Sequence, residues 1–202
     1  MPEDYLAELL DLMERYSFKR GDFTLSSGKR SNFYYDGKPV MLSPRGQILI
    51  GRIVFERVTR AGAEAVGGLT SGADFISSAV VYTSEVRGKP VPGFYVRDVP
   101  KEHGTREILY QSYSDNGHEV VSSGRRVAIV DDVMTTGKSI QKAISEVERR
   151  GAEVALVLTL VDRCDPEGDC IRNRYNFETL FSVDSEGRVR VDSTSSPHAA
   201  AV

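Results

Sequence analysis

Two long apolar runs, separated by one segment of helical length, constrain the fold more than any other feature of this sequence. Residues 125–132 read RRVAIVDD, and residues 152–162 read AEVALVLTLVD. Both runs are almost continuously apolar, as expected for strands that are buried on both faces of a sheet. The segment between them, GKSIQKAISEVERRG at 137–151, predicts a helix with Gly151 just past its end. A strand, a helix and a strand in this order predict a βαβ unit and therefore a parallel sheet.

The segments upstream continue this alternation. Ser43 is a favourable N-cap, Pro44 suits the first helical position and Gly62 suits a helix end. Residues 98–118 lack apolar periodicity and predict a long exposed loop, with a short strand near 108–113 as an option. The fold class expected is α/β, with a central and mostly parallel sheet flanked by helices. Predicted helices cover 3–16, 43–62 and 73–88, and predicted strands cover 63–69 and 90–96.

Composition narrows the classes of partner. The chain has 202 residues, 40% of them hydrophobic, which is enough for one sizeable core. A net charge of −3 argues against a nucleic-acid-binding surface. The chain has no apolar run long enough to span a membrane, and its acidic, amphipathic start does not resemble a signal peptide. We therefore expect a cytoplasmic protein with neither nucleic acid nor membrane as a partner.

Cys164 and Cys170 are the two cysteines of the chain, at the ends of the acidic segment CDPEGDC. Two cysteines do not make a disulfide framework. A zinc site would need two further ligands, and the histidines available are His103, His118 and His198. The simpler interpretation is a surface loop with two incidental thiols.

The segment VDDVMTTGKS, at 130–139, carries the strongest chemical signal. Its end resembles a nucleotide-binding P-loop, but that motif needs a second glycine five positions before Gly137, where Asp132 stands. Two carboxylates would repel a phosphate unless they faced another part of the ligand. The segment is therefore not expected to be an ATPase loop.

The placement of this segment suggests a different ligand. The apolar strand is predicted to end at Val130, and ligands of open parallel sheets bind at the carboxyl ends of strands. The following helix N-terminus, with the hydroxyls of its turn, can hold a phosphate. Asp131 and Asp132 are spaced to accept hydrogen bonds from neutral hydroxyls, so a phosphorylated sugar fits. The alternative is an ordinary strand–helix turn with a capping aspartate.

The motif resembles the phosphoribosyl diphosphate (PRPP) motif of the type I phosphoribosyltransferases. Three further stretches narrow the resemblance to orotate phosphoribosyltransferases: FTLSSGKRSNFYYD at 23–36, YVRDVPKEHG at 95–104 and LVDR at 160–163. The four stretches follow the order of that family. The resemblance implies the type I phosphoribosyltransferase fold in a single domain over 1–202, divided into an N-terminal hood (1–42), a PRPP-binding core (43–192) and a flexible tail (193–202).

The resemblance also implies an activity. A pentosyltransferase of this family converts orotate and PRPP to orotidine 5′-monophosphate and diphosphate, in pyrimidine (UMP) biosynthesis. It would work as a homodimer with shared active sites, and with Mg²⁺ bound mainly through PRPP rather than by protein ligands. The implied catalytic residues, which also bind the diphosphate, are Arg97, Lys101 and His103. The other implied PRPP-binding residues are Asp131, Asp132, Val133, Met134, Thr135, Thr136, Gly137, Lys138, Ser139, Thr70 and Ser71. The implied orotate-binding residues are Tyr34, Tyr35, Thr135 and Arg163.

Three positions depart from the family pattern. Lysines are common in the family, or in one branch of it, where Ser26, Ser71 and Asp98 stand. Each departure removes positive charge near a polyanion, and either other basic residues compensate or these positions vary freely. Three other functions stay open: a type I phosphoribosyltransferase for another base, a PRPP-sensing regulator that binds nucleic acid, and a catalytically silent paralogue. The residues that could compensate are Lys29, Arg30, Arg106 and Lys138.

Overall fold

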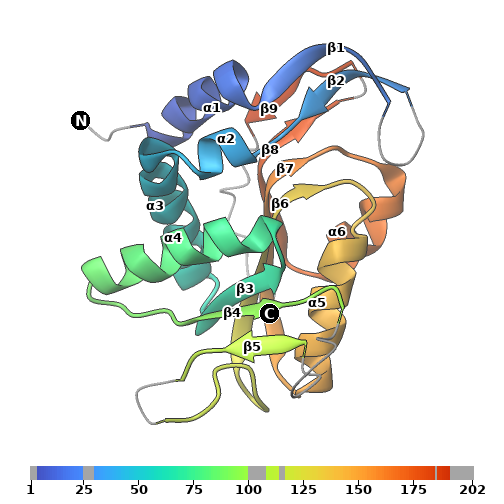
Figure 1. The fold of residues 1–202 in the computed structure, drawn as a ribbon. Helices are drawn as coiled ribbons and strands as arrows, with labels where there is room; N and C mark the ends of the chain where they lie inside the picture. The colour runs from blue at the N-terminus through green and yellow to red at the C-terminus, as the bar shows by residue number, and fades with distance from the viewer. Residues whose placement is uncertain (1–3, 25–29, 100–107, 114–116, 185, 192–202) are drawn as a thin grey trace, which may run out of the picture.

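A seven-stranded sheet forms the centre of the molecule. The computed structural model describes residues 4–24, 30–99, 108–113, 117–184 and 186–191 (Figure 1). The strand order is β5-β4-β3-β6-β7-β8-β9, in which the inner pairs are parallel and the two edge strands, β5 and β9, are antiparallel to their neighbours. This confirms the predicted α/β fold with a mostly parallel sheet. The strands are β3 (Ala65–Leu69), β4 (Gly93–Val96), β5 (Leu109–Gln111), β6 (Arg126–Met134), β7 (Glu153–Asp162), β8 (Phe177–Val183) and β9 (Val189–Val191).

The centre of the sheet is the pair β6 and β7, which are the two apolar runs of the sequence. Successive residues of β6 face opposite sides, so that Ala128 and Val130 join one buried apolar cluster while Val127 and Ile129 join the other. The sequence predicts a strand that ends at Val130, but β6 continues to Met134. Pairing with β7 extends it, because Met134 lies opposite Asp162 in the parallel register. The acidic pair therefore lies within the strand rather than after it.

Helices cover both faces of this sheet, with α3 and α4 on one side and α5 and α6 on the other (Figure 1). The predicted start of α3 is confirmed, because the Ser43 hydroxyl accepts a hydrogen bond from the Gly46 amide at 3.0 Å. The chain leaves α3 at Gly62, whose φ of 68° is the left-handed conformation that favours glycine. The helices are α1 (Tyr5–Tyr16), α2 (Lys38–Met41), α3 (Pro44–Arg60), α4 (Gly72–Val86), α5 (Lys138–Arg149) and α6 (Asp169–Arg174).

The N-terminal segment builds a small separate sheet from β1 (Phe18–Thr24) and β2 (Arg30–Tyr35), which pair antiparallel. This sheet lies beside β8 and β9 (Figure 1). The ring of Phe33 packs against Gly187 in the β8–β9 turn, where an added Cβ would lie 3.0 Å from the ring. The expected hood thus corresponds to α1, β1, β2 and α2, and it packs on the C-terminal strands.

The acidic segment CDPEGDC has more structure than a plain surface loop. It contains a 3₁₀ turn (Pro166–Gly168) and continues directly into α6. Cys164 and Cys170 are both exposed, and neither is in a disulfide. Within the described part of the chain, no helix is long and apolar enough to cross a membrane.

Candidate active site

The acidic pair lies at the carboxyl end of β6, in the middle of the sheet. Asp131 is 6% exposed, and its two carboxylate oxygens accept different hydrogen bonds. Oδ1 accepts from the Asp132 amide at 2.9 Å, and Oδ2 accepts from the Ser139 hydroxyl at 2.7 Å. Ser139 belongs to the first turn of α5, so this contact ties the acidic pair to the helix N-terminus that the sequence predicts as a phosphate site.

A second helix reaches the same carboxylates. An added Cβ at Gly72, the first residue of α4, would lie 2.5 Å from Oδ1 of both Asp131 and Asp132. A side chain does not fit at this position without displacing the acidic pair. The preceding Thr70–Ser71 peptide bond is cis, and the Thr70 amide donates to the Val96 carbonyl at 2.8 Å. The resemblance implies roles for Thr70 and Ser71 but none for Gly72, whose local signal in the sequence is a glycine at a strand–helix turn.

Burial changes the acidity of the pair. It raises the pKa of Asp131 to about 7, with a further rise from the charge of Asp132 and an opposing effect of the Ser139 hydrogen bond. Burial also raises the pKa of Asp132, and the hydrogen bond with Asp131 and the positive charge of Lys38 partly offset that rise. Near neutral pH the pair therefore carries less than two full negative charges, which reduces its repulsion of a phosphate-bearing ligand.

The turn from β6 to α5 is shaped by α6. Gly137 has a φ of 77°, and an added Cβ there would lie 2.9 Å from Cγ1 of Ile171 in α6. Gly168, just before α6, also lies close to this turn, since an added Cβ there would be 3.1 Å from the Thr135 carbonyl oxygen. The predicted phosphate turn, Thr135 to Ser139, is thus held against α6, which the sequence did not predict.

Arg163 stands beside this turn. Its amide donates to the Met134 carbonyl at 2.9 Å, and its guanidinium lies 4.5 Å from the centre of the Phe33 ring in β2. Burial lowers the pKa of Arg163, while the charge of Asp165 opposes the change. The preceding Asp162 is engaged by another residue, because Arg172 donates to its two oxygens at 2.7 and 2.8 Å. Phe33 of the hood therefore braces Arg163 beside the end of β6.

The two tyrosines assigned to orotate occupy different environments. Tyr34 and Tyr35 are consecutive in β2, so their side chains point to opposite sides of the strand. Tyr34 is 39% exposed and packs against Phe23, with ring centres 5.6 Å apart. Tyr35 is 7% exposed and packs against Phe18 at 5.1 Å. An exposed ring surface is available only from Tyr34, whereas Tyr35 offers its backbone.

The residues assigned to the diphosphate follow β4. Arg97 is half-buried, and its amide donates to the Ile108 carbonyl at 2.7 Å. Lys101 and His103 lie outside the described residues, as do Ser26, Lys29 and Arg106. Asp98, one of the three departures from the family pattern, forms an ion pair with Lys142 of α5.

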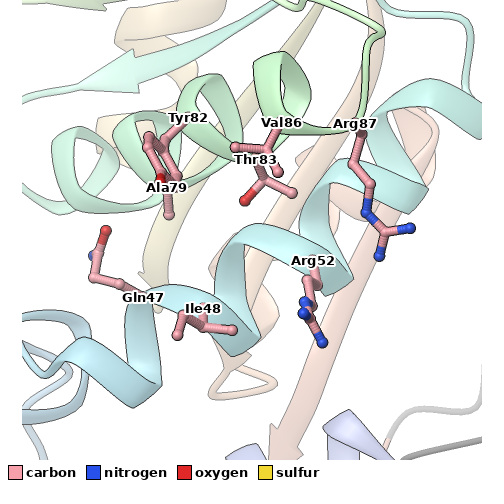
Figure 2. A pocket seen from close by; sticks show the side chains of 8 residues that line it. All are labelled: Gln47, Ile48, Arg52, Ala79, Tyr82, Thr83, Val86 and Arg87. Atoms are coloured by element: carbon pink, nitrogen blue, oxygen red, sulfur yellow. The ribbon is translucent and has the colours of Figure 1, made fainter.

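A separate hollow of about 280 Å³ lies between α3 and α4 and shares no lining residue with the acidic pair (Figure 2). Its lining includes Ile48, Tyr82 and Val86, all of them exposed apolar side chains. Arg52 and Arg87 stand at one end of this hollow (Figure 2).

Among the residues that the structure describes, no group of three or more His, Cys, Asp or Glu side chains is arranged to hold a metal ion.

Known proteins share both the sequence and the fold. The family model "Phosphoribosyl transferase domain" matches residues 65–187. Orotate phosphoribosyltransferase of Bradyrhizobium diazoefficiens is 42% identical over 157 residues, covering 78% of this chain and 82% of that protein. Orotate phosphoribosyltransferase of Nostoc sp. is 36% identical and covers 87% of this chain and 82% of that protein.

A solved structure agrees with these relatives. Orotate phosphoribosyltransferase of Mycobacterium tuberculosis in complex with PRPP superposes with a TM-score of 0.70 and 32% identity, covering 88% of this chain and 96% of that one. The sequence and the fold of this chain thus match one enzyme family over most of the chain. The matched region includes the acidic pair and the turn into α5. The chain belongs to the orotate phosphoribosyltransferase family.

Proposed function

We propose that this chain transfers the 5-phosphoribosyl group of PRPP to N1 of orotate, giving orotidine 5′-monophosphate and diphosphate. The observation that carries the proposal is the joining of three groups at one sheet edge. These are the buried acidic pair, the α5 N-terminus that Ser139 links to it, and Arg163 on the neighbouring strand end. The M. tuberculosis relative in complex with PRPP supports the choice of donor substrate.

The ribose and its phosphate lie along the β6–α5 segment. Asp131 and Asp132 accept hydrogen bonds from the ribose hydroxyls, and the amides and hydroxyls of 135–139 hold the 5-phosphate. Acceptors for the hydroxyls and donors for the phosphate hold the sugar at two points and restrict its rotation, which brings C1 into line between the incoming nitrogen and the departing diphosphate. The remaining contacts with PRPP along this segment come chiefly from the backbone of Val133, Met134, Gly137 and Lys138.

The base is held between β2 and the end of β7. Arg163 binds the orotate carboxylate through two parallel hydrogen bonds, for which a planar guanidinium is suited. The Phe33 ring beneath Arg163 keeps the guanidinium in place. The exposed ring of Tyr34, the backbone of Tyr35 and Thr135 form the remaining contacts with the base.

The diphosphate leaves from the side of β3 and β4. Thr70 and Ser71 lie against it, and Arg97, Lys101 and His103 supply positive charge as the bond to C1 breaks. In this proposal the chain that follows Arg97 closes over the bound substrates and excludes water, which otherwise would hydrolyse PRPP.

Mg²⁺ fits this arrangement as an ion carried by the substrate. It commonly keeps several waters and binds through substrate phosphates with few protein carboxylates. In this proposal the ion is held mainly through PRPP rather than by protein ligands. When bound, the ion neutralises negative charge on the diphosphate.

We also propose that two copies of the chain form a homodimer with shared sites, in the cytoplasm. The exposed apolar side chains at the α3–α4 hollow, Ile48, Tyr82 and Val86, support a protein contact on that face. Within each copy, the hood (1–42) would cover the base, and the core (43–192) would hold PRPP.

The test is a comparison of bases. Purified protein is mixed with PRPP and Mg²⁺, and the loss of orotate, uracil or hypoxanthine is followed in separate reactions. Consumption of orotate alone, with equimolar release of diphosphate, is the expected result. Consumption of another base in preference to orotate would assign the chain to a different specificity, and no consumption of any base while PRPP binds would indicate a catalytically silent protein.

A further inference from the structure

The Tyr35 hydroxyl is a buried polar group that has no hydrogen-bond partner among the described residues. The Tyr35 side chain is 7% exposed, and its Oη atom is shielded from solvent. A buried hydroxyl without a partner destabilises the folded state, because nothing replaces the water that it has lost. A phenylalanine at this position would fill the same space without that destabilisation. A functional role of the hydroxyl would explain its presence here.

The neighbourhood of this hydroxyl is tightly built. Gly37 lies against it, since an added Cβ at Gly37 would be only 2.6 Å from Oη. The turn that carries Gly37 is fixed on both sides: the Asp36 amide donates to the Ser17 carbonyl at 3.0 Å, and the Met41 amide donates to the Gly37 carbonyl at 2.9 Å. The hydroxyl therefore occupies a defined position and is not free to swing into solvent.

The buried cluster that holds the Tyr35 ring extends to the acidic pair. The Tyr35 ring belongs to the same buried cluster as Val130 and Ala73, which are the chain neighbours of Asp131 and of Gly72. The electrostatics agree with this. Burial raises the pKa of the Tyr35 hydroxyl most, and the negative charges of Asp132, Asp36 and Asp131 raise it further. A phenol in this place is a hydrogen-bond donor within electrostatic reach of carboxylates that can accept.

We propose that the Tyr35 hydroxyl is a positioning group of the ribose site: when PRPP binds, it donates a hydrogen bond to the Asp132 carboxylate and keeps that carboxylate directed toward the ribose hydroxyls. A carboxylate has about four lone-pair sites, so Asp132 can accept from the phenol and from the sugar together. The inference rests on PRPP being the donor substrate and adds a residue from the hood to its binding site.

The main test compares Tyr35→Phe with the wild type. Loss of the hydroxyl should raise the KM for PRPP about tenfold, equivalent to about 1.4 kcal/mol, with kcat and the KM for orotate changed less than about twofold. Thermal stability of the free protein should stay the same or rise, because an unpartnered buried hydroxyl is removed. A purely structural role for Tyr35 predicts the reverse: lower stability and no selective effect on PRPP.

The pH dependence gives a second readout. The charged groups that act on the hydroxyl are Asp131 and Asp132 from β6 and Asp36 from the turn after β2. Lys38 from α2 pairs with Asp36 and acts on Asp132. A hydrogen bond donated to a carboxylate favours its ionised form. Tyr35→Phe should therefore move the acidic limb of the PRPP-affinity profile to higher pH, whereas an unchanged profile would argue against contact with the acidic pair.

Two further variants keep the test decisive. Gly37→Ala places a methyl group against the hydroxyl and should weaken PRPP binding in the same way, even if Tyr35→Phe folds poorly. Tyr113→Phe removes an exposed phenol and should change nothing. Calorimetric titration of the protein with PRPP, in the presence of Mg²⁺, separates PRPP binding itself from the role of the Tyr35 hydroxyl. If the wild type does not bind PRPP, both fail; if wild type and Tyr35→Phe bind equally well, only the role of the hydroxyl is wrong.

Discussion

At the scale of single residues, Arg163 is the group expected to choose the base. Orotate differs from uracil by a carboxylate at C6, and this charge needs a partner in the closed site. Removing one member of a buried charged pair costs about 3–5 kcal/mol. Arg163→Leu should therefore reduce kcat/KM for orotate by two to three orders of magnitude, on the order of that energy. PRPP affinity should change little.

The control for this prediction is Arg174→Leu, which removes an exposed arginine from the nearby end of α6. It should leave both substrates unaffected. Steady-state kinetics with orotate and a separate PRPP titration measure the two effects. A loss of less than about fivefold for orotate, or an equal loss of PRPP affinity, would show that Arg163 is not the carboxylate anchor.

Asp131 should make the stability of the fold depend on pH. Burial raises its pKa to about 7, whereas an aspartate in an unfolded chain titrates near about 3.9. The folded state thus keeps a proton that the unfolded state has already released, so this contribution to stability is full below about pH 4 and is lost as the pH rises to about 7. The side chain of Asp131→Asn is uncharged at every pH in this range, so the variant lacks this contribution to the pH dependence.

Urea unfolding at pH 5 and pH 8 measures this effect. Between these values, the wild type should lose about 2–3 kcal/mol of unfolding free energy relative to Asp131→Asn, at about 1.4 kcal/mol per pH unit. Asp22→Asn, which changes an exposed aspartate, should run parallel to the wild type. If the Asp131→Asn curve also runs parallel, Asp131 has an ordinary acidity.

At the scale of elements, one ion pair joins α6 to the end of β7. Arg172 grips Asp162 through two hydrogen bonds and also donates to the Asp165 carbonyl at 3.0 Å. Arg172→Met would leave the buried Asp162 carboxylate without this partner. The expected cost is about 3 kcal/mol, at the low end for a buried pair because 20% of the Arg172 side chain is exposed.

The matched control for this pair is Arg15→Met in α1. Arg15 pairs with Asp11 at 2.7 Å, but 63% of its side chain is exposed, so the loss should be below about 1 kcal/mol. Chemical denaturation of both variants tests the contrast. Because α6 supports Gly137 and the phosphate turn, Arg172→Met should also weaken PRPP binding, and equal stability losses in the two variants would refute the buried role of the pair.

At the scale of the whole molecule, the proposed homodimer with shared sites predicts complementation. Lys101→Ala and Asp132→Asn should each be inactive alone, because one lacks a proposed diphosphate-binding cation and the other a proposed ribose acceptor. After subunit exchange, a heterodimer should contain one intact site, and an equimolar mixture should recover roughly a quarter of wild-type activity. Confirmed heterodimers without recovered activity would mean that each chain supplies its own loop.

The sequence by itself determined those features that follow from local patterns. The apolar runs of β6 and β7 and the segment between them predict the βαβ unit, because strand and helix periodicity are local properties. Ser43 and Gly62 correctly predict the limits of α3, because capping depends on a few adjacent residues. The spacing of Asp131, Asp132 and Ser139 likewise follows from a strand running into a helix.

The tertiary structure alone decided the contacts between segments far apart in the chain. Phe33 meets Arg163, and Gly72 meets the acidic pair, only because of the strand order and the packing of the hood on β8 and β9. The end of β6 at Met134, rather than Val130, is set by its register with β7. The burial of Tyr35 beside an exposed Tyr34 depends on which face of β2 meets the core. Register, strand order and facing are cooperative results of packing, and no local pattern of residues specifies them.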